Sequence, residues 1–555
     1  MPTTIAIYCK NNKKYKEVPA GASLYEIYEL VGSPLPYRPM NAQVNNRTEG
    51  LNYRCWTPKD IEYFDYTNQS GLRVYVRSLC HILSKAVSDV LPSATMNLEH
   101  SVSKGYYCVI RKDHNLEQQT IDKIKARMQE IIDSDIPFCH KFARTEEAVA
   151  LFREKGMEDK ARLIETAGMT YTSYYELGGH IDFFYGCLTP SSGYIHLFDI
   201  VPYFDGILLR IPQRKDPSKL EPVIRQDKMF EVFKEHLTLL RTLELNNVGD
   251  LNKAINEGHT QEIIMVSEAM QEKQVAKIAE QIAHRYQEGA RIVLISGPSS
   301  SGKTTFTKRL AIQLITYLLH PVSISLDDYF LSRVDTPKDE KGDYDFESLY
   351  ALDLPYFNSD MGKLLNGEEI DLPTYSFTTG TRIYRGQKLK LKENSVLLIE
   401  GIHALNPELT DHIEDSYKFK VYISALTSIS LDNHNWIPTT DNRLLRRIIR
   451  DNLFRGYSAK DTISRWPDVR RGEDKWVFPY QETADVMFNS AMPYELGVLR
   501  KYAEPALTEV RERDKENAEA YRLMRFLKYF NPISDEVLPG TSLLKEFLGG
   551  GSFKY

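Results

Sequence analysis

The segment Arg291-Ile-Val-Leu-Ile-Ser-Gly-Pro-Ser-Ser-Ser-Gly-Lys-Thr-Thr305 decides the fold of the C-terminal half of this chain. Residues 292–296 form an apolar run typical of a buried strand, and a helical pattern follows Lys303. Between them, Gly297 to Thr304 matches GxxxxGK[ST], a pattern whose backbone N–H groups curl around phosphates at a helix N-terminus. Strand, glycine-rich turn and helix in this order predict a phosphate-binding loop rather than a serine- and glycine-rich connector.

The residues of this loop have expected roles in binding ATP and Mg²⁺. Lys303 can bridge the β- and γ-phosphates, and the Thr304 hydroxyl can ligate Mg²⁺. The glycines let the backbone N–H groups of the turn approach the phosphates. We therefore predict a nucleotide-binding set made of Gly297, Ser299, Ser300, Ser301, Gly302, Lys303, Thr304 and Thr305.

The segments after the loop continue the same alternation of strand and helix. The runs VSISL (322–326), VLLIE (396–400) and FKVYIS (419–424) are nearly continuous in apolar residues and are separated by helical segments. This order indicates a parallel sheet covered by helices on both faces. We expect an α/β domain over 262–515 and a helical tail over 516–555.

The first half of the chain has a different texture. Residues 1–67 alternate short apolar runs with turn residues, which predicts a small mixed sheet crossed by one helix. Residues 68–245 begin with an amphipathic helix and continue as mixed strands and helices, so we expect an α+β domain there. The segment 246–258 is polar and is predicted to be a junction. The whole chain is therefore expected to be multidomain, with α+β and α/β parts.

Composition restricts the class of protein. The 555 residues contain 42% hydrophobic and 26% charged residues, with a formal net charge of -6, which is ordinary for a globular chain and argues against a surface built entirely for nucleic acid. We see neither an apolar run long enough for a membrane span nor the pattern of a signal peptide. The six cysteines are irregularly spaced within the first 190 residues, without a CxxC pair. Reduced thiols and a cytoplasmic location are expected.

The segment SISLDDYFLS (323–332), after the phosphate loop, resembles the uridine kinase and phosphoribulokinase family. Its apolar run delivers Asp327 and Asp328 to the carboxyl edge of the sheet, where ligands of such sheets bind. In that family an aspartate here is the general base for a sugar hydroxyl. By register the resemblance assigns this role to Asp327, with Asp328 as its rival, and a surface acidic pair is the alternative.

Two further segments resemble the acceptor site of that family. Phe346 and Glu347 fall where the family has a Phe-Asp pair that holds ribose hydroxyls, with glutamate replacing aspartate. In DLPTYSFTTGTR (371–382), the residues that match the stretch framing the base are Tyr375, Phe377 and Arg382, although packing in a core would also explain these aromatic rings. The family's pyrimidine kinases have a base-contacting histidine where this chain has Gly380, so the preferred base is left open.

The resemblance also supplies a metal ligand and a set of arginines. Glu400 ends the run VLLIE and could hold Mg²⁺ opposite the phosphate loop. The segment DNRLLRRIIRDNLFRGYS (441–458) resembles a lid whose arginines close over the transferred phosphoryl group, and we assign that role to Arg446, Arg450 and Arg455. Tyr457 stands where the family has a further arginine, and a solvated basic helix face is the alternative.

The N-terminal half resembles parts of threonyl-tRNA synthetase. Residues 1–67 are similar to the TGS domain, a β-grasp module, and residues 68–245 are similar to the second additional domain, whose HxxxH and CxxxH motifs assemble an editing pocket. This chain has Arg77 and His81 in the first motif and Glu176 and His180 in the second. A site of His81, Glu176 and His180 could still bind zinc. The alternatives are intact editing, or a retired pocket kept as a scaffold or as an RNA- or nucleoside-sensing surface.

Together these patterns predict an ATP-dependent kinase that phosphorylates the 5′-hydroxyl of a nucleoside. Two alternatives use the same loop: a kinase acting on a sugar phosphate or another small alcohol, and a nucleotide-dependent switch whose N-terminal domains bind tRNA or another RNA. The expected partners are a nucleoside, RNA contacted through the N-terminal domains, and a second copy of the chain, with no membrane contact.

Overall fold

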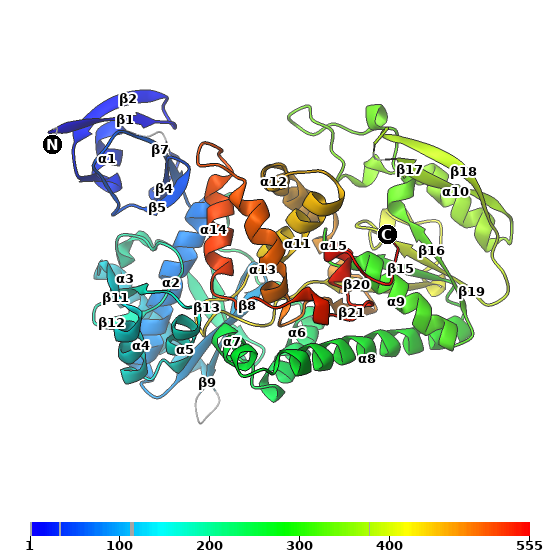
Figure 1. Ribbon diagram of the computed structural model, residues 1–555, viewed down its shortest axis with the longest axis horizontal. Helices are drawn as coiled ribbons and strands as arrows, with labels where there is room; N and C mark the ends of the chain where they lie inside the picture. Colours follow the sequence, from blue (N-terminus) through cyan, green and yellow to red (C-terminus); the bar gives the residue numbers. More distant parts are fainter. Residues whose placement is uncertain (1–2, 33–34, 112–115, 377, 555) are drawn as a thin grey trace.

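The computed structural model describes residues 3–32, 35–111, 116–376 and 378–554. Near the N-terminus, a five-stranded mixed sheet has the order β2-β1-β7-β4-β5, and α1 lies across it (Figure 1). Ser23 caps α1 in a capping box with Glu26, which explains why the helix begins there. This agrees with the small sheet and single helix expected from the sequence. The elements are β1 (Thr4–Cys9), β2 (Lys14–Pro19), β3 (Ala22–Ser23), α1 (Leu24–Val31), β4 (Pro39–Val44), β5 (Arg47–Gly50), β6 (Arg54–Cys55) and β7 (Lys59–Asp65).

The next region is built around the long helix α2. The middle of α2 is buried on nearly all sides. The same region contains a four-stranded sheet of order β13-β14-β9-β8 and a three-stranded sheet of order β10-β11-β12. The elements are α2 (Gln69–Val90), β8 (Thr95–Val102), β9 (Gly105–Arg111), α3 (Gln118–Asp133), β10 (Phe138–Arg144), α4 (Thr145–Glu154), α5 (Glu158–Thr166), β11 (Tyr171–Leu177), β12 (His180–Asp182), β13 (Asp199–Tyr203), β14 (Gly206–Arg210) and α6 (Asp227–Thr242).

The segment 246–258 is not the polar junction that its composition suggested. Most of it forms helix α7 (Val248–Asn256), capped by the side chain of Asn247, which accepts the N–H of Asp250. Val248 and Leu251 are buried in a core that also includes residues of the C-terminal half. A few apolar positions per turn are enough to bury a short helix between two larger bodies, so the polar average was misleading. The 28-residue helix α8 (Thr260–Gln287) follows.

The C-terminal half contains the predicted parallel sheet. Its order is β16-β19-β15-β20-β21, and every adjacent pair of strands is parallel. Alternate residues of β15 enter two different cores: Val293 and Ile295 pack with α8 and α9, whereas Ile292 and Leu294 pack with α10. Both faces are therefore covered, as predicted. The elements are β15 (Ile292–Ser296), α9 (Lys303–Thr316), β16 (His320–Ser325), α10 (Leu354–Leu365), β19 (Ser395–Glu400), β20 (Lys418–Ser424) and β21 (Val486–Asn489).

Two additions surround this sheet. A hairpin of β17 (Ile370–Ser376) and β18 (Thr381–Leu389) projects beyond α10 (Figure 1). Helices α11 (Thr439–Phe454), α12 (Ala459–Trp476), α13 (Glu495–Thr508) and α14 (Asn517–Leu527) lie toward the N-terminal half, and α15 (Lys545–Leu548) lies beside α9 and α11. One hydrophobic core runs from α4, α5 and α7 through α11, α13 and α14, so the two halves share buried side chains.

The described part of the chain has no helix with both the length and the apolar character that crossing a membrane requires. The six cysteines are free thiols, as the irregular spacing suggested.

Candidate active site

The phosphate loop lies between β15 and α9, as its sequence pattern predicted. A Cβ atom at Gly297 would lie 2.2 Å from the carbonyl oxygen of Ile423, so a larger residue there would push β15 and β20 apart. Gly302 has a φ of 87° and precedes the first residue of α9, a left-handed conformation that favours glycine. The two glycines of the motif thus allow the loop to turn tightly and the helix to begin at Lys303.

Lys303 bends back over the loop. Its ammonium donates to the carbonyl oxygens of Gly297 (2.9 Å) and Pro298 (3.1 Å). Burial lowers the pKa of Lys303, while the carboxylates of Glu400 and Asp327 oppose that shift. The ammonium is therefore held beside the loop and faces acidic side chains from two neighbouring strands, β16 and β19.

Thr304 and Glu400 bring two oxygen ligands together. The Thr304 hydroxyl donates to Oε1 of Glu400 at 3.3 Å. Burial raises the pKa of Glu400 to about 7, despite the opposing effect of Lys303. A hydroxyl and a carboxylate oxygen at this separation fit the hard-oxygen ligands that Mg²⁺ takes beside substrate phosphates. These two residues suit the metal role predicted for them.

Asp327 and Asp328 face different surroundings. The side chain of Asp327 is exposed, yet the surrounding protein raises its pKa, against the effects of Lys303, Arg455 and Arg450. Oδ1 of Asp328 instead accepts the backbone N–H of Tyr375 at 3.0 Å, which ties Asp328 to β17. This difference favours Asp327 over its rival as the residue that faces the phosphate loop.

Two arginines of α11 support the loop from behind. Arg443 donates to the carbonyl oxygen of Ser299 (3.0 Å), and Arg446 donates to that of Ser300 (3.4 Å). Arg446 is fully buried and ion-paired with Glu495. Its guanidinium is thus fixed in the core, which does not agree with a mobile lid arginine. Helical spacing places Arg446 on the buried face of α11.

The other two arginines lie near Asp327. Burial and the neighbouring Arg455 lower the pKa of Arg450 to about 10, and the charges of Arg450 and Arg455 both act on Asp327. Arg455 follows the end of α11, is half-exposed, and pairs with Asp451 at 3.4 Å. These positions place the charges of Arg450 and Arg455 near Asp327.

Glu473 of α12 is a loop partner that the sequence did not indicate. Its Oε1 accepts the N–H of Ser299 (2.9 Å), and its Oε2 accepts Arg443 (2.9 Å). Glu473 is 1% exposed. It lies 174 residues from Ser299 in a helix whose charge pattern resembles a solvated surface, so no local signal could have identified it.

Glu347 lies against the same wall. A Cβ at Gly472 would be 2.3 Å from the Cβ of Glu347, which places the Glu347 side chain directly on α12. Burial raises the pKa of Glu347 to about 7, opposed by Arg447. Its neighbour Phe346 is 42% exposed. A partly buried carboxyl beside an exposed ring is compatible with the acceptor contact predicted for this pair.

The hairpin residues are more firmly packed than expected. Tyr375 is 8% exposed, with its ring 5.7 Å from that of Phe330, so packing explains this aromatic side chain. Arg382 donates to Asp353 (3.1 Å) and stacks over Tyr356 (4.5 Å), which attaches the hairpin to the start of α10. Phe377 lies outside the described residues.

The structure leaves no room at Gly380 for the histidine that the family's pyrimidine kinases have at this position. It has a φ of 70°, and a Cβ there would lie 2.9 Å from both Cβ and Nε of Arg333. Arg333 also donates its backbone N–H to the carbonyl oxygen of Gly380 (2.8 Å). The turn is therefore built for glycine, and Arg333 is the side chain next to it.

The histidines of the N-terminal half do meet, but with a different carboxylate. Ligand atoms of His81, His180 and Asp182 all lie within 4.8 Å of one another. Glu176 is absent from this group, since it pairs across the hairpin with Ile181 whereas His180 pairs with Leu177. Opposed residues share a face and successive residues alternate, so Glu176 points away from His180 and Asp182 points with it. Glu176 instead approaches Lys141, at 3.8 Å.

The carboxylate of Asp182 already has two close partners. Lys160 lies 3.0 Å and His434 lies 2.7 Å from its oxygens. Burial opposes ionisation of Asp182, but His434 and Lys160 outweigh it and lower its pKa. Lys160 also pairs with Asp432 at 2.9 Å. A loop of the C-terminal half that carries Asp432 and His434 thus packs against Lys160 and Asp182. A metal would have to compete with Lys160 for the carboxylate of Asp182.

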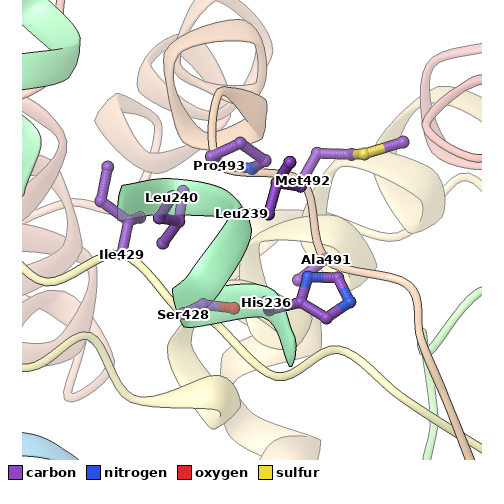
Figure 2. Close-up of a pocket in the computed structure, with 8 residues that line it drawn as sticks. All are labelled: His236, Leu239, Leu240, Ser428, Ile429, Ala491, Met492 and Pro493. Atoms are coloured by element: carbon purple, nitrogen blue, oxygen red, sulfur yellow. The ribbon is translucent and has the colours of Figure 1, made fainter. Parts of the chain in front are cut away.

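A separate small cavity lies between α6 and the C-terminal half (Figure 2). It is lined mainly by apolar side chains such as Leu240, Ile429 and Met492, with His236 at its edge. Burial lowers the pKa of His236 to about 4, so this imidazole is neutral. None of the predicted site residues lines the cavity, and it carries no chemistry of its own.

Comparison with known proteins gives separate matches for the two halves. Residues 292–495 match the model of the phosphoribulokinase and uridine kinase family. The N-terminal region is similar to threonine–tRNA ligases. That of Geobacter sp. (strain M21) is 24% identical over 185 residues, 33% of this chain and 29% of the ligase. That of Syntrophotalea carbinolica is 29% identical over 227 residues, 39% of this chain and 36% of the ligase. The matches therefore span about a third of these ligases.

Two solved structures are similar to part of the chain. A putative fructose transport system kinase from Silicibacter sp. TM1040 is 17% identical, covering 39% of this chain and 98% of that one, with a TM-score of 0.29. A possible uridine kinase from Bacillus stearothermophilus is 20% identical, covering 36% of this chain and 89% of that one, with a TM-score of 0.22.

Proposed function

We propose that this chain, whose residues 292–495 form a P-loop kinase domain of the phosphoribulokinase and uridine kinase family, transfers the γ-phosphate of ATP to the 5′-hydroxyl of a nucleoside. The observation that carries this proposal is the placement of Asp327. It follows the end of β16, within the electrostatic reach of Lys303, Arg450 and Arg455. A carboxylate opposite these cations is placed to accept a proton from an alcohol while they stabilise the phosphoryl charge.

Each residue of the proposed site has its own role in the transfer. Asp327 takes the proton of the acceptor hydroxyl while the acceptor oxygen forms a bond to the γ-phosphorus. The bond between the γ-phosphorus and the bridging oxygen of the β-phosphate breaks, which releases ADP. Lys303, Arg450 and Arg455 neutralise the charge on the phosphates. Thr304 and Glu400 would hold Mg²⁺, which supplies further charge neutralisation when bound. Arg446 and Glu473 do not touch the substrate; they keep Ser299 and Ser300 in position.

The test is a screen of acceptors. The purified protein is incubated with ATP or GTP and each common nucleoside, and then with sugar phosphates and other small alcohols, and the phosphorylated product is identified by mass spectrometry. A nucleoside 5′-monophosphate formed stoichiometrically with ADP supports the proposal. Phosphorylation of a sugar phosphate alone would replace the acceptor class, and ATP hydrolysis stimulated by RNA but by no acceptor would indicate a switch.

The acceptor KM is expected to depend on pH through Glu347. Because burial raises the pKa of this carboxyl to about 7, it is protonated below that pH and becomes the better acceptor for ribose hydroxyls above it. The ionised fraction rises roughly tenfold between pH 6 and pH 8, and KM should fall by about the same factor. Steady-state kinetics across this range measure the change.

The control for this prediction is Glu347→Gln, which keeps the shape but cannot ionise. Its acceptor KM should be nearly constant over the same pH range, while kcat keeps whatever pH dependence Asp327 imposes. If the variant and the original protein show the same KM profile, Glu347 does not contact the acceptor.

We also propose, from the similarity to threonine–tRNA ligases, that the N-terminal half contacts tRNA or another RNA. The proposed division is a TGS module at 1–67, a synthetase-like domain at 68–245, the kinase at 262–515 and the tail at 516–555. The cytoplasmic location and assembly with a second copy stay predictions. Binding of labelled tRNA to the whole protein, measured at several salt concentrations, tests the RNA contact.

A further inference from the structure

The C-terminal segment, residues 538–554, lies on the phosphate loop. Leu543 and Phe547 are completely buried in the same core as α9 residues Phe306 and Leu310. A Cβ at Gly302 would be 2.5 Å from Leu543, so this segment touches the loop itself. Figure 1 accordingly places α15 and the end of the chain beside α9 and α11.

Glu546 of α15 occupies the N-terminus of α9. Its Oε2 accepts the backbone N–H of Thr305 (3.0 Å) and the Thr305 hydroxyl (2.8 Å). Thr305 is the third residue of α9, and the N–H groups in the first turn of a helix are the ones that bind anions. In a loop of this sequence pattern, the backbone N–H groups at the start of the helix cradle the α- and β-phosphates.

The charges around Glu546 are those expected around a phosphate. The Glu546 carboxylate acts on Lys303 and Arg450, two cations that the proposed reaction uses. It also contributes to the raised pKa of Glu400, because two carboxylates then share one small region. Glu546 therefore supplies negative charge at a place where a bound nucleotide would supply its own.

We propose that Glu546 is a built-in competitor of the nucleotide: its carboxylate occupies the position of the α-phosphate and must leave before ATP binds. This inference rests on the proposed kinase function. The rest of the segment need not unfold, because Leu543, Leu544 and Phe547 are anchored in the core on either side of Glu546. Displacement requires only rotation of one half-buried side chain away from Thr305. The tail thus sets the affinity of the phosphate loop for nucleotide.

The test compares ADP and ATP binding to the full-length protein, Glu546→Gln and Glu546→Ala by isothermal titration calorimetry, without acceptor. Removing a charge-assisted hydrogen bond that competes with the ligand should lower the dissociation constant of both nucleotides by about tenfold. The matched control is Glu536→Gln, an exposed glutamate in the same tail, whose dissociation constants should equal those of the unaltered protein. Thermal melting establishes that each variant is folded, and the isosteric Gln variant guards against a failure of the Ala variant.

Two results would overturn the inference. Unchanged affinity in both Glu546 variants would show that the carboxylate does not compete, and weaker binding would show that it helps to hold the nucleotide or its metal. Both differ from failure of the proposed function, in which neither the unaltered protein nor any variant binds ADP or ATP.

Discussion

Replacement of Asp327 by asparagine is expected to lower kcat for acceptor phosphorylation by about 10²–10⁴-fold, the usual contribution of a positioned general base. Asparagine keeps the size of the side chain but cannot accept the hydroxyl proton. Affinity for ATP should remain or rise slightly, since the phosphates are held by the loop and by cations that Asp327 does not bind directly. Steady-state kinetics give kcat, and calorimetry gives the ATP dissociation constant.

Asp328→Asn is the matched control for this substitution. The amide oxygen of asparagine can still accept the Tyr375 N–H, so the structural role of this side chain is retained. A modest effect on kcat is therefore expected. If Asp328→Asn lost activity and Asp327→Asn kept it, the roles of the two aspartates would have to be exchanged.

Replacement of Lys160 by methionine is expected to reduce the free energy of unfolding by about 3–5 kcal/mol, the range found when one partner of a buried ion pair is removed. Burial disfavours the charged form of Lys160, yet Asp182 and Asp432 outweigh that effect and raise its pKa. The Lys160 side chain is 1% exposed. Without it, both carboxylates remain buried with less compensation. Urea denaturation followed by circular dichroism measures the change.

Arg153→Met provides the comparison for that experiment. Arg153 pairs with Glu165 at 2.7 Å, but both side chains are about half-exposed and water screens the pair. Its removal should hardly change the denaturation midpoint. Equal midpoints for the Lys160 and Arg153 variants would mean that the buried network adds nothing to stability.

The sequence was sufficient to predict the parallel sheet and the phosphate loop. Those features depend on local patterns: the apolar run at 292–296, the glycines at Gly297 and Gly302, and carboxylates at the ends of two later strands. The order of such segments constrains the topology strongly, because parallel strands need crossovers and place their carboxyl ends at one edge. This is why Lys303, Thr304, Asp327 and Glu400 come together as expected.

The remaining features depend on contacts between distant segments. Glu473 and Glu546 reach the loop from 174 and 241 residues away, and neither lies in a recognisable motif. Helical spacing cannot tell which arginines of α11 face the core, so the sequence groups Arg446 with the lid arginines. The exchange of Glu176 for Asp182 followed from strand register, which spacing alone left undetermined.

The core shared by α5, α7, α11 and α13 has a practical consequence for dissecting this protein. Cutting the chain between α6 and α8 would strip Ile429, Leu431 and Leu445 of their covering, and would separate Asp432 from Lys160. A recombinant kinase fragment beginning at α8 would then expose a large hydrophobic patch and tend to aggregate. We therefore expect that neither half folds well alone, so acceptor preference is best mapped on the intact polypeptide.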